Sequence, residues 1–356
     1  MISNKSHTKE WLERTRNWHK GKDPILIEKV IKALTLLEQL KLKGVDFIFK
    51  GGSSLLLLLK EINRFSIDID IILPGKFENL DEIFKSIIKD GLFIGYEEDK
   101  RVSSSIVPKS HFKFFYNSVL NISKHNAVVL LDILFEANPY VRTVSLPIEC
   151  PFIDTESPMT NVTLPDINCI LGDKLTAFAP ETTGIPYSKE KSLEIIKQLY
   201  DIGKLFDRFD NIQAVGESFK HIAGKELAYR DLHQLDIFHV LDDIFETSVV
   251  IASRGTYKKE CFDELNEGIK KMVHYTYLEP YRIEDAVASA AKAAYLSRLL
   301  KISHWEKIHR FNKDEDLSSL NITHPNFTKY NKIKKYKPEA FFYWYQTIKL
   351  VGMPEE

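Results

Sequence analysis

Hydrophobic positions recur at helical spacing early in the chain and alternate with polar positions further on. Over residues 25–42, apolar side chains return every three or four residues, which predicts an amphipathic helix. Residues 47–49 form a short apolar run that enters Gly51-Gly52, which predicts a strand followed by a helix beginning near Ser53. Residues 67–73, with the sequence IDIDIIL, alternate and are rich in β-branched side chains, which predicts a second strand.

The pattern changes in the middle of the chain. A helix near 79–90 and strands over 113–116 and 128–135 are expected, and repeated prolines then predict an irregular stretch up to residue 165. Almost every later segment has helical spacing. The sequence therefore predicts an α+β fold with a mixed α/β domain over 1–163 and a mostly α-helical bundle over 164–356.

Composition and charge exclude several classes of protein. The chain has 356 residues, of which 44% are hydrophobic and 28% charged, as in ordinary globular proteins. With 49 basic and 50 acidic residues, no global field attracts nucleic acid or an anionic membrane, so any such contact needs a local patch. Three cysteines without a CxxC pair favour a reducing cytoplasm over a disulfide framework or a zinc ribbon. Neither a signal peptide nor a membrane span is recognisable, so we expect a cytoplasmic protein without a membrane partner.

Asp68 and Asp70 are the first candidates for chemistry. They are two residues apart in the expected strand 67–73, so their side chains would share one face, with isoleucines on the other. Neighbouring carboxylates repel each other unless a cation lies between them, and a hard divalent cation is the usual partner. A lone DxD pattern is not specific, and a solvated strand face remains the alternative.

The segment Lys50-Gly51-Gly52-Ser53-Ser54 joins an expected strand to an expected helix. Glycines there allow a phosphate to approach the backbone, and the N–H groups of a helix N-terminus attract anions. A tight turn with a serine N-cap is the alternative explanation. The segment is not a Walker A loop, because no Gly-Lys-Ser/Thr follows at the required spacing.

Asp132 is an acidic residue within the apolar run VVLLDILFE. Burying such a side chain without a partner is costly, and a metal ion shared with Asp68 and Asp70 would supply one. Glu136 is the reserve candidate if the strand continues that far. Three carboxylates that hold Mg²⁺ or Mn²⁺ beside a phosphate-binding turn indicate phosphoryl or nucleotidyl transfer from an NTP.

The two motifs together resemble a known signature. Gly51-Gly52-Ser53, followed by RFSIDID over 64–70, resembles the pattern GG[ST]xL…RxSxDxD of AbiEii/AbiGii-type toxins within the nucleotidyltransferase superfamily. Residues 170–177 and 197–202 resemble two helical motifs of that branch, with Gln198 where the family usually has Asp. The resemblance implies a nucleotidyltransferase-type mixed sheet with flanking helices, followed by the helical domain.

The resemblance also implies roles for single residues. The metal ligands would be Asp68, Asp70 and Asp132. The catalytic residues would be Asp68, Asp70, Lys174 and Asp201. The nucleotide would be bound by Gly51, Gly52, Ser53, Ser66 and Lys174. Lys174 and Asp201 come from the helical domain, so we expect one active site between the two domains.

Several alternatives remain open at this point. Lys197 and Asp201 are four apart on an expected helix, and an i,i+4 ion pair facing solvent would also explain them. Ser66 is either a site of modification that switches activity off, as in the related toxins, or a hydrogen-bonding residue. The stretch 329–349 is basic and aromatic, which fits RNA contact or a helical core, and the core is favoured for its aromatic residues.

The function implied by the resemblance is that of a toxin from a toxin–antitoxin or phage-defence pair. It would transfer a nucleoside monophosphate from an NTP, release pyrophosphate and use the 3′ end of tRNA as the acceptor, with a cognate antitoxin as candidate partner. The alternatives are a small-molecule or protein acceptor, or a degenerate nucleotide-binding module. The sequence does not specify which NTP is used or the oligomeric state.

Overall fold

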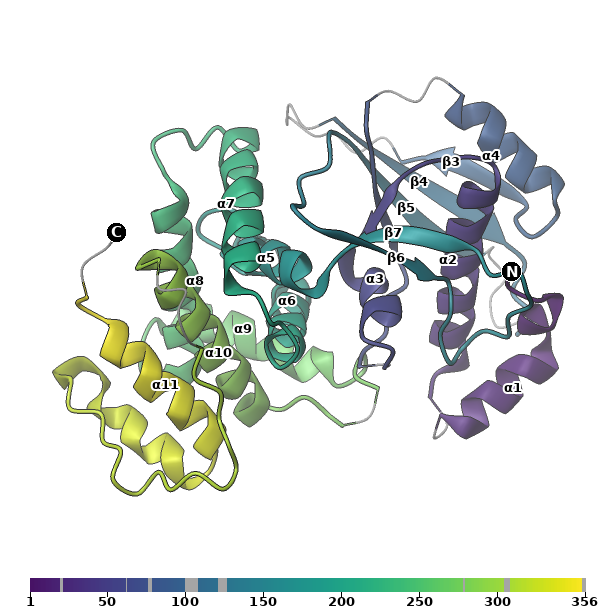
Figure 1. Cartoon of the computed structure of the whole chain (residues 1–356). Coiled ribbons are helices and arrows are strands. Elements are labelled where there is room, and N and C mark those ends of the chain that lie inside the picture. The colour runs from purple at the N-terminus through teal and green to yellow at the C-terminus, as the bar shows by residue number, and fades with distance from the viewer. Residues whose placement is uncertain are drawn as a thin grey trace. The chain divides into compact units, whose positions relative to one another are not determined.

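A computed structural model describes residues 1–19, 22–61, 63–75, 79–99, 108–120, 127–277, 279–303 and 308–353 of the chain (Figure 1). The chain divides into two compact units. The first consists of Met1–Asp166 with Tyr275–Leu278, and the second of Ile167–His274 with Glu279–Glu356. No helix among the described residues has the length and apolar character needed to cross a membrane.

The first unit combines helices with a single mixed sheet. Its elements are η1 (Asn4–His7), α1 (Lys9–Trp18), α2 (Pro24–Leu42), β1 (Ile48–Lys50), α3 (Gly51–Leu58), β2 (Ile69–Leu73), α4 (Leu80–Lys89), β3 (Gly95–Glu98), β4 (Lys109–Tyr116), β5 (Ala127–Phe135), β6 (Thr143–Pro147) and β7 (Asn161–Pro165). The strand order is β3-β4-β5-β2-β1-β7-β6. Because β2 pairs parallel with β5 and antiparallel with β1, the sheet is mixed, as the sequence predicts.

One face of this sheet carries the core of the first unit. Ile69 and Ile71 of β2 and Leu131 and Ile133 of β5 are buried in one cluster with the apolar side chains of α2. Phe84 of α4 packs edge-on against the aromatic rings of β3 and β4. Strand residues alternate between two faces, so the residues between these apolar positions must project from the opposite face.

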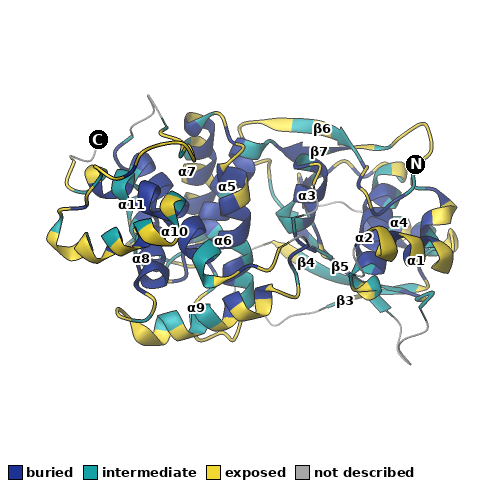
Figure 2. Cartoon of the chain, turned by 90° about the horizontal axis from the view of Figure 1, so that it is seen from below, coloured by how far each residue is buried: buried dark blue, intermediate teal, exposed yellow. Residues whose placement is uncertain are grey.

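The second unit is entirely helical among its described residues. Its elements are α5 (Ile167–Ala177), α6 (Ser192–Phe206), α7 (Ile212–Tyr229), α8 (Ile237–Ser253), α9 (Lys259–Met272), α10 (Ile283–Lys301), η2 (Pro325–Lys335) and α11 (Pro338–Leu350). In Figure 2, α5 is mostly buried, whereas α9 has an exposed edge. The α+β class, with a mostly helical second part, is confirmed.

The C-terminal aromatic residues belong to the core of this helical unit. Phe341, Phe342 and Trp344 are buried, and Trp344 lies 4.7 Å, centroid to centroid, from Tyr330 of η2. Tyr345 is half-buried. The core interpretation of the aromatic residues is thus confirmed for three of the four, and the neighbouring lysines are considered separately below.

Two expectations about the elements are wrong. Strand β2 begins at Ile69 rather than at residue 67, so Asp68 precedes it. Strand β5 ends at Phe135, as expected, so the reserve candidate Glu136 lies outside the strand, although the Glu136 N–H still donates to the Leu73 carbonyl. The proline-rich stretch is not irregular throughout, because it holds the paired strands β6 and β7. The domain boundary expected near residue 163 lies within β7, close to Asp166, where this segment of the first unit ends.

Candidate active site

Four polar residues form one row across the middle of the sheet. Asp70 of β2 is paired with Asp132 on the parallel strand β5 and with Lys50 on the antiparallel strand β1. Asp132 is paired in turn with His111 on β4. Residues directly opposite each other on neighbouring strands project from the same face, so all four side chains lie on the face opposite the apolar core.

The row brings Asp70 and Asp132 together, as the sequence analysis expects. Neighbouring strands lie about 4.8 Å apart, so the two carboxylates extend from adjacent backbone positions. Asp132 is not sealed in the core, because 35% of its side chain is exposed. Its Oδ1 atom lies 2.7 Å from Nδ1 of His111, whose imidazole can donate a hydrogen bond to it. The structure therefore gives Asp132 a partner that was not among the candidate ligands.

Asp68 is placed differently from Asp70. It is exposed and lies before β2, so strand alternation does not orient its side chain. Its backbone carbonyl accepts a hydrogen bond of 2.5 Å from the Ser53 hydroxyl of α3. Ser53 is buried, so its hydroxyl joins the start of α3 to the aspartate segment.

The glycine turn between β1 and α3 packs directly against these residues. Gly51 has a φ of +76°, a region that favours glycine, and a Cβ atom there would collide with the carboxylate of Asp70. A Cβ on Gly52 would lie 2.5 Å from Nη2 of Arg64 and 2.7 Å from Oγ of Ser66. Gly51, Gly52, Ser66 and Asp70, which the sequence analysis selects from two separate motifs, therefore meet at one place.

This packing gives a prediction for stability. Replacing Gly51 with alanine is expected to lower the free energy of unfolding by about 2–5 kcal/mol, the sum of a left-handed backbone cost and a collision with Asp70. Gly44→Ala is the matched control, because Gly44 has a φ of +83° and no atom within 4 Å of an added Cβ. It should cost only about 1–2 kcal/mol. Urea unfolding of both variants measures the difference, and equal losses would contradict the packing of Asp70 on Gly51.

The two carboxylates of the row fit a hard divalent cation. Among the described residues, no group of three His, Cys, Asp or Glu side chains is arranged to hold a metal ion. Mg²⁺, however, is usually bound by one or two carboxylates together with substrate phosphates and water. Asp70 and Asp132 supply two carboxylates on adjacent strands beside a glycine turn, and this arrangement meets that requirement.

Lys174 and Asp201 meet within the helical unit. The Nζ atom of Lys174 on α5 lies 3.1 Å from Oδ2 of Asp201 on α6, and both side chains are almost fully buried. The same ammonium donates to Oε1 of Gln198 at 3.0 Å. Gln198, the departure from the family pattern, therefore still contacts Lys174. Lys197 pairs with Glu194 at 2.8 Å on the same helix.

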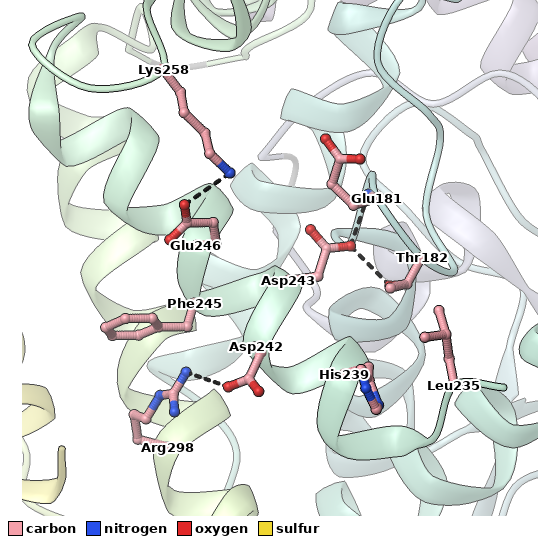
Figure 3. Close-up of a pocket in the computed structure, with 10 residues that line it drawn as sticks. All are labelled: Glu181, Thr182, Leu235, His239, Asp242, Asp243, Phe245, Glu246, Lys258 and Arg298. Carbon is pink, nitrogen blue, oxygen red and sulfur yellow. Dashed lines mark hydrogen bonds and ion pairs between the residues drawn. The ribbon is translucent and has the colours of Figure 1, made fainter. Parts of the chain in front are cut away.

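A separate pocket lies in the helical unit (Figure 3). It measures about 510 Å³, and two ion pairs join charged side chains that line it. Arg298 donates to Asp242 at 2.8 Å, and Lys258 lies 2.9 Å from Glu246. Asp243 accepts hydrogen bonds from the Glu181 N–H and the Thr182 hydroxyl, and burial raises the pKa of its carboxyl to about 6. None of the candidate site residues lines this pocket.

A comparison with protein families assigns the chain. The model of the AbiEii nucleotidyl transferase toxin, of type IV toxin–antitoxin systems, matches residues 35–263. The chain belongs to this family. Membership of this family supports the activity of a nucleotidyltransferase of toxin type. The matched residues include the glycine turn, the row across the sheet, Lys174 and Asp201.

Two solved structures are also similar to the chain. One is a candidate nucleotidyltransferase from H. pylori, with 18% identity, a TM-score of 0.41 and coverage of 77% of this chain and 92% of that one. The other is JHP933 from Helicobacter pylori, with 16% identity, a TM-score of 0.40 and coverage of 84% and 93%. No curated protein matches the chain.

His111 and Lys50 belong to the row but are not among the site residues selected from the sequence. From the sequence, His111 is expected at most to line the cleft, because it precedes the Asp132 strand by 21 residues, and it is assigned no role there. The only signal is the strand pairing, which places residues 111 and 132 opposite each other.

Proposed function

We propose that the protein is a metal-dependent nucleotidyltransferase toxin that transfers a nucleoside monophosphate from an NTP to the 3′ end of tRNA and releases pyrophosphate. The observation that carries the proposal is the pairing of Asp70 with Asp132 beside the Gly51-Gly52 turn, in a chain of the AbiEii family. A carboxylate pair next to a glycine-containing helix N-terminus suits an NTP bound with its cation.

Two aspartates of the row and the residues around the glycine turn have distinct roles in this proposal. Asp70 and Asp132, joined by Asp68, hold Mg²⁺ or Mn²⁺, and such an ion would neutralise the triphosphate and stabilise charge on the transferred group. The backbone N–H groups at the start of α3 bind the phosphates. Ser53 binds phosphate through its backbone N–H, because its hydroxyl already donates a hydrogen bond to the Asp68 carbonyl. Ser66, whose hydroxyl lies against Gly52, contributes its side chain.

Lys174 is proposed as a phosphate ligand on the family resemblance. Its ammonium would balance the charge of the triphosphate, and Asp201 and Gln198 would hold that ammonium in place. The same contacts also hold α5 against α6, so a loss of activity on replacing Lys174 would not by itself identify a phosphate ligand.

A row of lysines on η2 supports an RNA acceptor. Lys329, Lys332 and Lys335 are exposed and recur every three residues, which is the period of a 3₁₀ helix. With a rise of about 2.0 Å per residue, successive lysines lie about 6 Å apart along one edge. Within the described part of the chain, none of the three has an acidic ion-pair partner, whereas Arg254, Lys258 and Lys337 each have one. A nearly neutral protein thus carries a local cationic edge that suits a phosphate backbone.

The lysine edge gives a prediction about salt. In the triple variant Lys329→Gln, Lys332→Gln and Lys335→Gln, we expect the slope of log tRNA affinity against log salt concentration to become shallower by about 2–3. Each phosphate contact that is lost removes the release of about one counterion. A matched triple variant at Lys5, Lys9 and Lys85 changes the net charge equally, but these lysines already pair with acidic side chains. Fluorescence anisotropy with labelled tRNA measures both slopes. Equal slopes would exclude the η2 lysines from the contact.

Label transfer tests the proposed reaction as a whole. The full-length protein is incubated with Mg²⁺, one α-³²P-labelled NTP at a time and total tRNA, and both labelled RNA and pyrophosphate are measured. We expect transfer from at least one NTP, abolished by EDTA and restored by Mg²⁺ or Mn²⁺. If pyrophosphate is released and the label appears on a small molecule or a protein instead of RNA, the acceptor is not tRNA, and that part of the proposal is wrong. Absence of both products with every NTP would contradict the proposal.

A further inference from the structure

His111 contacts a carboxylate of the row without belonging to the aspartate motif. Its Nδ1 atom lies 2.7 Å from Oδ1 of Asp132, and only 22% of its side chain is exposed. Strands β4 and β5 pair along eight residues, from Lys109 opposite Leu134 to Tyr116 opposite Ala127. The long β4–β5 ladder therefore fixes the backbone positions of His111 and Asp132 relative to each other.

Among the described residues, the contact engages Oδ1 of Asp132 and leaves Oδ2 for another partner. An ionised carboxylate has two oxygens, and a hydrogen bond to Oδ1 fixes the plane of the group while Oδ2 stays available. Carboxylates that bind metal ions are themselves commonly hydrogen-bonded, and such partners orient the ligand. Asp70, on the far side of Asp132 in the row, is held by its packing on Gly51. The side chain of Asp132 is thus held by His111, and that of Asp70 by its packing against Gly51.

We propose that His111 is a positioning residue that orients the Asp132 carboxylate for the divalent cation. The inference rests on the proposed function, since it assigns Asp132 to the cation. His111 acts through a single N–H donor at the Nδ1 position. It does not touch the nucleotide or the cation.

A purely structural role for His111 predicts something different. A cross-strand polar pair contributes about 0.2–1 kcal/mol to stability, and losing it would lower the melting temperature slightly without changing metal affinity. The two explanations separate when the position of the N–H donor is varied between two amide side chains. The amide nitrogen of asparagine occupies nearly the position of Nδ1, whereas that of glutamine corresponds to Nε2.

The test uses full-length protein carrying His111→Asn, His111→Gln or His111→Ala, with His233→Ala as a control. His233 is 72% exposed and also contacts an aspartate, Asp231, at 3.1 Å. Mn²⁺ binding is measured by electron paramagnetic resonance in the absence of nucleotide, and label transfer is measured in parallel. We expect Mn²⁺ affinity to fall about 10–100-fold in the alanine and glutamine variants and to stay within a few-fold of wild type in the asparagine variant and the control.

The outcomes separate this inference from the function on which it rests. Wild-type Mn²⁺ affinity in His111→Ala would overturn the positioning role and leave the proposed function standing. Equal losses in the asparagine and glutamine variants would also overturn it, because the donor position would not matter. A wild-type protein that neither binds Mn²⁺ nor transfers label would overturn both.

Discussion

Replacement of Asp70 by asparagine is expected to reduce nucleotidyl transfer at least about a hundredfold while leaving the fold intact. A cation that stabilises charge on the transferred phosphoryl group contributes several kcal/mol, and each 1.36 kcal/mol corresponds to a factor of ten in rate. Asparagine keeps the volume of the side chain, so its packing against Gly51 is preserved while the negative charge is lost. The measurement is the rate of label transfer to RNA at saturating Mg²⁺.

Asp132 provides an internal check on this prediction. Because Asp70 and Asp132 are proposed to hold the same ion, the double variant Asp70→Asn and Asp132→Asn should be no slower than either single variant. If the fold losses in transfer rate of the two single variants multiply in the double variant, Asp70 and Asp132 have independent roles. Glu97→Gln is the matched control, since Glu97 is an exposed carboxylate on β3 of the same sheet. Label transfer at the wild-type rate by Asp70→Asn would show that the pair of Asp70 and Asp132 does not take part in the reaction as proposed.

The sequence predicts the parts of the fold in which a hydrophobic period is long or a turn is marked. Helix α2 is found within one residue of its expected start, because nineteen residues repeat the apolar spacing. Strand β5 is found because its run is long and β-branched. In both cases the local pattern and the tertiary environment favour the same structure.

The strands that sequence reasoning misses are those whose stability comes from pairing. Strand β3 has the sequence GYEE, with no apolar alternation, and is held by its ladder to β4. Strands β6 and β7 each end in a proline, and this residue usually signals a loop. The partner strand in each case decides the conformation, and sequence alone does not identify that partner.

The same limit applies to the candidate site. The glycine turn and the aspartates carry recognisable spacing, so they can be selected from the sequence. Their arrangement into one row depends on the registers of β1, β2, β4 and β5, which no local pattern encodes. His111 enters the site only through that register. The exposed position of Asp68 likewise follows from where β2 begins, and strand ends are the least certain part of a sequence-based prediction.

The buried pair of Lys174 and Asp201 is expected to have the largest effect on stability. Lys174→Met should lower the free energy of unfolding by about 3–5 kcal/mol, because it removes the ammonium that compensates a buried carboxylate. Gln198 loses its donor at the same time. The double variant Lys174→Met and Asp201→Asn carries no uncompensated charge and should regain most of the loss. Urea unfolding measures all three proteins, with Lys270→Met as a control in which an exposed i,i+3 pair is broken without measurable change.

The double variant also separates the two roles assigned to Lys174. If the ammonium only stabilises the contact between α5 and α6, restored stability should restore label transfer as well. If it balances the charge of the triphosphate, the double variant should fold like wild type and still transfer at least about a hundredfold more slowly, with the Michaelis constant for the NTP raised. Wild-type transfer by a stable double variant would limit Lys174 to the fold. A single variant that is as stable as wild type would instead show that the buried carboxylate does not depend on this lysine.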